Sequence, residues 1–92
     1  MLRESAHREQ VARDRARLER EERRNAERAA LERAAALDAA RRDVELAIRA
    51  AREARRVGSG VAATDAEWRR AKARLIELET GAPPEWALPD GG

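Results

Sequence analysis

Four arginines near the start of the chain follow one another at helical spacing. Arg13, Arg17, Arg20 and Arg24 are three or four residues apart. Residues at these steps share one face of an α-helix, and the planar guanidinium group suits bidentate binding of phosphate. These four residues are therefore candidate phosphate contacts. Glu9, Glu21 and Glu27 dilute the positive charge, and this half of the chain has no aromatic residue to stack on a base.

Residues suited to catalysis or metal binding are scarce. The only histidine, His7, is near the start of the chain and is expected at the surface, and the sequence has no cysteine. The 18 acidic residues are interspersed with 20 basic ones, so no carboxylate pair is isolated from a neutralising charge. The sequence contains no glycine-rich phosphate loop and no histidine cluster. We therefore predict no catalytic, cofactor-binding or metal residue, no cofactor and no small-molecule substrate, and we expect that the protein is not an enzyme.

A single long helix must carry most of these side chains. Residues 2–57 contain neither Gly nor Pro and are rich in Ala, Arg and Glu, which favour helix. A helix of about 55 residues would be roughly 80 Å long, too long to be buried by the remainder of a 92-residue chain. We expect its N-terminal part to stand alone, self-associate or lie on another molecule. The pattern divides it into a charged part, residues 1–28, and an Ala-rich packing part, residues 29–57.

The Ala-rich part has a heptad pattern. Leu37, Val44 and Ala51 are seven residues apart, and the positions three further on are all alanines: Ala40, Ala47 and Ala54. This pattern predicts coiled-coil-like packing with closely spaced helix axes. Leu46 and Ile48 widen the apolar stripe on its two sides, which suits two neighbouring helices better than one.

The charged part allows two interpretations. Val11, Leu18 and Asn25 also fall seven residues apart, as in a coiled-coil seam with a polar residue that sets the register. Charged residues fill the intervening core positions, which favours a solvated helix held by i,i+4 ion pairs such as Glu9 with Arg13.

A turn and a second helix follow. The Gly58-Ser59-Gly60 sequence predicts a turn over residues 58–63, and Thr64 with Glu67 has the spacing of a capping box. A short amphipathic helix is therefore predicted over residues 64–80, with Gly81 as its C-terminal cap. We expect a helical hairpin, paired as far as about residue 40, whose two faces are Trp68, Ala71, Leu75 and Leu78 on one helix and Val44, Ala47, Ile48 and Ala51 on the other.

Residues 81–92 form a Pro-rich tail, predicted to be extended. Trp86 and Leu88 are more apolar than a purely solubilising tail requires. In one interpretation Trp86 covers the open end of the hairpin near Leu75 and Leu78. In the other, residues 84–89 are a docking peptide for a partner.

The predicted fold class is therefore all-α. The leading functional hypothesis is a non-catalytic structural or assembly protein that binds a protein partner or itself in a larger complex, for example as a virion component, scaffold or adaptor. Nucleic-acid association through the arginine face is the alternative.

No signal peptide or membrane-spanning segment is recognisable, and the polar half lacks the apolar residues of a membrane-surface helix. We therefore expect the protein to be located in the cytoplasm or in a particle assembled there. The predicted interface residues are Leu37, Val44, Ile48, Ala51, Trp68, Leu75, Leu78, Trp86 and Leu88.

Overall fold

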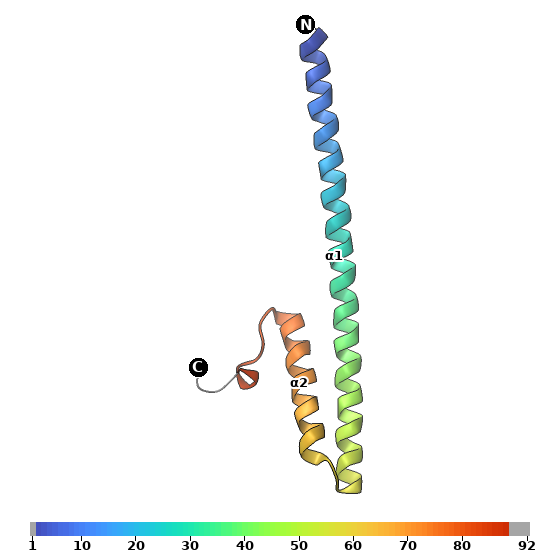
Figure 1. Ribbon diagram of the computed structural model, residues 1–92, viewed down its shortest axis with the longest axis vertical. Helices are drawn as coiled ribbons and strands as arrows, with labels where there is room; N and C mark the ends of the chain where they lie inside the picture. Colours follow the sequence, from blue (N-terminus) through green and yellow to red (C-terminus); the bar gives the residue numbers. More distant parts are fainter. Residues whose placement is uncertain (1, 89–92) are drawn as a thin grey trace. The chain divides into compact units, whose positions relative to one another are not determined.

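Helices account for nearly all of the chain. The structure, a computed structural model, describes residues 2–88 and leaves out the side chain of Leu2. Helix α1 (Leu2–Val57) has 56 residues, α2 (Val61–Thr80) has 20, and a 3₁₀ turn, η1, spans Glu85–Ala87 (Figure 1). No strand occurs among the described residues, so the all-α prediction is confirmed. The chain forms two compact units, residues 1–32 and 33–92, which are described separately below.

The first unit contains the charged part of α1 and the first four residues of the Ala-rich part, 29–32. None of residues 3–32 is buried, and its large apolar side chains, Val11, Leu18 and Leu31, are 42%, 53% and 73% exposed. The predicted pair of Glu9 with Arg13 forms, with 3.5 Å between Oε2 and Nη2. Whether Val11 and Leu18 belong to a coiled-coil seam stays a prediction.

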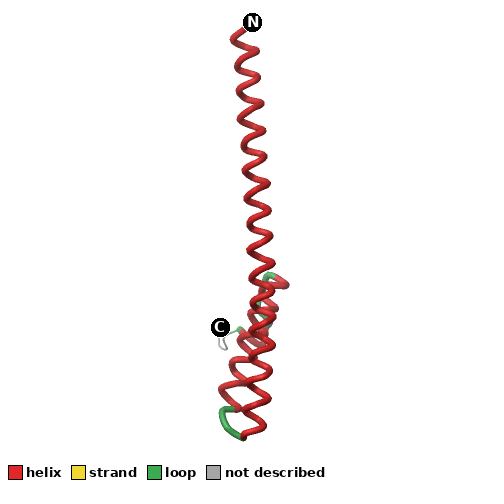
Figure 2. Tube along the Cα trace, turned by 90° about the vertical axis from the view of Figure 1, so that its right-hand side faces the viewer, coloured by secondary structure: helices red, strands yellow, loops and turns green. Residues whose placement is uncertain are grey.

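The second unit is a helical hairpin. In it α2 lies beside the C-terminal part of α1 (Figures 1 and 2), which confirms the predicted fold. At its centre are Ala40, Val44 and Leu75, which are 2%, 8% and 8% exposed. Leu37, Ile48 and Ala71 pack against this core. The predicted seam alanines Ala47, Ala51 and Ala54 are buried as well.

The turn between the helices is shorter than predicted. The N–H groups of Gly58 and Ser59 both donate to the carbonyl of Ala54, at 2.8 and 3.1 Å, and satisfy the end of α1. Gly58 and Gly60 adopt positive φ angles of 73° and 76°, which Gly tolerates because it has no Cβ. The chain has therefore completed its reversal at Gly60, and α2 begins at once with Val61.

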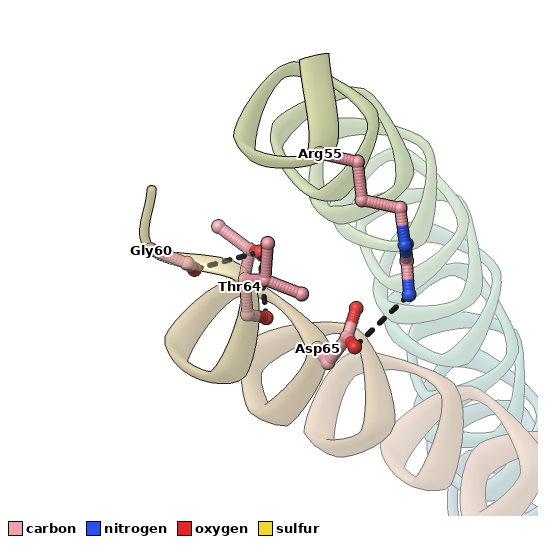
Figure 3. Close-up of polar contacts among 5 residues, drawn as sticks. Arg55, Gly60, Thr64 and Asp65 are labelled. Atoms are coloured by element: carbon pink, nitrogen blue, oxygen red, sulfur yellow. Dashed lines mark hydrogen bonds and ion pairs between the residues drawn. The ribbon is translucent and has the colours of Figure 1, made fainter. Parts of the chain in front are cut away.

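The predicted helix start at Thr64 is therefore wrong. Thr64 lies inside the first turn of α2, where its hydroxyl is 3.0 Å from the carbonyl oxygen of Gly60 and 3.1 Å from that of Val61 (Figure 3). It hydrogen-bonds to carbonyls and does not cap the helix N–H groups. The other end of α2 is as predicted, since Gly81 has φ 87° and its N–H donates to the carbonyl of Glu77 at 2.8 Å.

The tail returns along the outer side of α2. Pro84 and Leu88 are extended, as expected, and η1 forms a single turn between them. Trp86 lies beneath the guanidinium group of Arg69, whose Cζ is 5.3 Å from the ring centroid. The prediction that Trp86 covers the hairpin end near Leu75 and Leu78 is wrong, because η1 lies on the side of α2 that faces away from α1 (Figure 1). The last position of the predicted docking peptide, residue 89, lies outside the described residues.

Candidate functional site

The hairpin itself covers most of the residues predicted to form an interface. Val44, Ala51 and Leu75 are buried within it, and Leu37 and Ile48 pack against its core. Apolar area that is already covered by another helix of the same chain contributes little to binding a partner. A role for these five residues between chains stays a prediction.

The remaining predicted interface residues retain exposed surface. Leu78, Trp86 and Leu88 are 37%, 45% and 51% exposed. Trp68 is half-buried, although its spacing predicted it on the face of α2 that packs against α1. These side chains are the accessible part of the predicted interface.

A second apolar stripe lies on α1, away from the hairpin core. Leu46 and Val57 are 58% and 53% exposed, Ala39 is exposed and Ala50 is partly buried. These four residues, which we call the outer stripe, are separated by seven, four and seven positions and therefore share one face. At 3.6 residues per turn, this face is turned well away from Val44 in the hairpin core. Of these four residues, only Leu46 was predicted from the sequence to belong to an apolar stripe; the spacing of the other three was the available signal.

A groove of about 480 Å³ runs between α1 and α2 near the turn. We call it the arginine groove. Its lining consists of Ile48, Ala51, Arg52 and Arg55 from α1, and Asp65, Trp68 and Arg69 from α2.

One ion pair crosses between the helices at the arginine groove. Nη2 of Arg55 is 3.0 Å from Oδ2 of Asp65 (Figure 3). The sequence does not predict this site. Its charged residues, Arg52, Arg55, Asp65 and Arg69, lie on two helices, and only packing sets the register between these helices.

Arg69 also borders a second, smaller hollow of about 330 Å³ on the outer side of α2. Trp86 and Pro83 from the tail line it, together with Arg70, Ala73 and Arg74. Arg69 therefore connects the tail to the arginine groove. The attraction between a guanidinium and the face of an indole ring favours this arrangement.

The predicted arginine face in the first unit is partly neutralised. Arg13 pairs with Glu9, and Nη2 of Arg17 is 3.6 Å from Oδ1 of Asp14. Arg20 and Arg24 are exposed and form no ion pair with the described residues. Phosphate binding by this face stays a prediction.

Two neighbouring side chains near the C-terminal end of α1 have shifted pKa values. Nε of Arg56 donates to Oε2 of Glu53 at 2.9 Å, and Nη2 donates to the other carboxylate oxygen. This hydrogen bonding lowers the pKa of Glu53 and raises the pKa of Arg56. Both side chains are exposed, which is typical of a surface ion pair on a helix.

Residues 2–88 were found to hold neither a metal-binding cluster nor a membrane-spanning helix. These residues contain no group of three or more His, Cys, Asp or Glu side chains arranged to hold a metal ion. Neither described helix combines the length and apolar character needed to cross a membrane. In comparisons with known proteins, no family model, curated protein or solved structure matches the chain.

Proposed function

We propose that this protein is a non-catalytic structural or assembly protein that packs through helix faces in a multi-chain complex, for example in a virion, scaffold or adaptor assembly. The observation that carries the proposal is the outer stripe of α1. Leu46 and Val57 are more than half exposed although α2 covers the neighbouring face of the same helix segment. One helix with two apolar faces suits a position between two neighbours, and the chain supplies only one of them.

The composition of the outer stripe favours helix packing over other uses. Its two large residues alternate with Ala39 and Ala50, and small residues allow a second helix to approach closely. The stripe is also narrow, so we expect association to be reversible at micromolar concentration.

Sedimentation of two matched variants tests this proposal. Leu46→Gln places a polar amide within the outer stripe, while Glu45→Gln places the same side chain on the neighbouring exposed position. We expect Leu46→Gln to shift the association equilibrium toward monomer, or to lose a partner recovered from the native source, and Glu45→Gln to behave as wild type. Wild-type protein that is monomeric throughout the micromolar range and recovers no partner would contradict the proposal.

Binding of nucleic acid by the first unit is a second candidate function. Arg20 and Arg24 support it because they are exposed and unpaired among the described residues. Association by release of counterions from phosphates weakens steeply as salt rises. Binding of a 20-base-pair DNA duplex at low salt, lost when Arg20 and Arg24 are replaced by Glu, would support this function. No binding at low salt would exclude it.

A further inference from the structure

The arginine groove combines an apolar floor with a charged rim. Trp68, Ile48 and Ala51 supply the apolar surface. Trp68 is the largest side chain of α2, and it is only partly buried although it lines a groove between two helices. An indole face that is open to a groove is a suitable contact for an aliphatic or aromatic side chain of another molecule.

The rim carries an excess of positive charge. Three arginines and one aspartate line the groove, and Asp65 is engaged by Arg55 across the two helices. Arg52 on α1 and Arg69 on α2 form no ion pair with the described residues. Two guanidinium groups, one from each helix, are therefore available to anionic groups of a ligand.

The tail holds one of these guanidinium groups in place. Arg69 lies over the ring of Trp86, and both residues line the smaller hollow next to the groove. An arginine that is already ordered by an aromatic ring loses less side-chain entropy when it binds a carboxylate. Trp86 would then act as a positioning residue for Arg69.

We propose that the arginine groove binds a protein segment in which an apolar side chain is flanked by carboxylates. The apolar side chain lies against Trp68 and Ile48, and the carboxylates pair with Arg52 and Arg69. The proposal rests on the assembly function above, because it names the chemistry of a partner, but it uses a different surface from the outer stripe. Two separated guanidinium groups around an apolar floor fit such a segment better than the continuous row of phosphates in a nucleic acid.

Matched peptides test the chemistry of the groove. The probe is a fluorescein-labelled 15-residue helical peptide with Leu at steps of three and four residues and Glu at the flanking positions. A second peptide replaces every Glu by Gln, and a 15-nucleotide single-stranded DNA serves as the polyanion control. With the full chain, we expect the Glu peptide to bind more tightly than both controls, and to bind less tightly as salt rises.

Three arginine variants locate the binding. Exposed ion pairs contribute modestly, so we expect Arg52→Gln and Arg69→Gln each to weaken binding of the Glu peptide by about two- to fivefold. Arg49→Gln, which removes an exposed arginine of α1 outside the groove lining, should leave the affinity unchanged. Equal effects of all three variants would show attraction by overall charge alone and would overturn the proposal.

The tail variants test the role of Trp86. Trp86→Ala should weaken binding of the Glu peptide about as much as Arg69→Gln, and Trp86→Phe, which retains an aromatic face, should restore part of it. Trp86→Ala should have no further effect in the Arg69→Gln background. Circular dichroism checks that each variant keeps the helix content of wild type.

The remaining outcomes are decisive as well. Equal affinity for the Glu and Gln peptides, tighter binding of the DNA, or no binding of the Glu peptide would each overturn the proposal. Sedimentation of the Leu46→Gln variant reports on the outer stripe independently, so failure of the groove proposal and failure of the assembly function are distinguishable.

Discussion

At the residue scale, two apolar side chains of α2 that were both expected on the packing face of the hairpin are buried to different depths. Leu75 is 8% exposed and lies with Ala40 and Val44 at the hairpin core, whereas Trp68 is half-buried beside the arginine groove. The heptad pattern identified the correct face of α2, since both residues belong to it. It did not determine how deeply each would be buried, because depth depends on the separation of the two helix axes at each level.

Replacement of Leu75 should therefore destabilise the hairpin more than replacement of Trp68. Leu75→Ala removes a buried side chain and should lower the free energy of unfolding by about 2 to 4 kcal/mol. Full burial of Trp68 would have predicted about 3 to 5 kcal/mol for Trp68→Ala. Because part of its surface stays exposed, we expect about 1 to 2 kcal/mol. Urea unfolding followed by circular dichroism measures the free energy of unfolding of both variants. A larger loss for Trp68→Ala than for Leu75→Ala would show that Trp68 is the main core residue.

The ion pair of Glu53 with Arg56 should make a small, pH-dependent contribution to stability. Because the folded state lowers the pKa of Glu53, this contribution is present above the ordinary pKa of a glutamate and is lost as the pH falls through the lowered value. Glu53→Gln should thus be less stable than wild type at neutral pH and approach it in acid. Glu45→Gln, at an exposed position outside the ion pairs described, is the control. A difference that is the same at both pH values would contradict the assignment.

At the element scale, the sequence predicted where helices end better than where one begins. Helices α1 and α2 end at Val57 and Thr80, and each end is followed directly by a glycine with a positive φ angle, Gly58 or Gly81. Thr64 and Glu67 have the spacing of a capping box, but that spacing occurs within helices as well as at their starts. Gly60 had already completed the turn, and nothing in the next three residues, Val61 to Ala63, prevents helix formation.

The two alternatives for the start of α2 predict different mutational effects. Gly60→Ala places a Cβ in open space but at φ 76°, so it should cost about 1 kcal/mol through backbone strain alone. Thr64→Ala would cost about 1 kcal/mol if Thr64 were the N-cap. Since its hydroxyl only hydrogen-bonds to carbonyls of the first turn, we expect less than half of that loss. Thermal unfolding of the two variants checks the order, and a larger effect of Thr64→Ala would favour the later start.

At the scale of the whole molecule, the sequence predicted the hairpin but not the grooves or the position of the tail. The absence of Gly and Pro, the seven-residue repeats and the Gly58-Ser59-Gly60 turn are local signals, and they determine which helix faces meet. Contacts such as Arg55 with Asp65 and Arg69 with Trp86 join positions that share no periodic pattern. They follow from the register between the helices and the path of the tail, which local spacing does not encode.

The distribution of buried residues predicts how the chain responds to truncation. Among the described residues, every buried side chain lies between Ala40 and Leu75, and none of residues 3–32 is buried. Deletion of residues 1–32 should therefore change the free energy of unfolding of the hairpin by no more than about 0.5 kcal/mol, as is usual for changes at exposed sites. Deletion of residues 61–92 should instead abolish cooperative unfolding, because the seam alanines of α1 lose their only described partner helix. Circular dichroism during thermal unfolding distinguishes the two truncations. If deletion of residues 1–32 destabilised the hairpin as much as Leu75→Ala, the first unit would contribute to the stability of the second through contacts that its exposed side chains do not indicate.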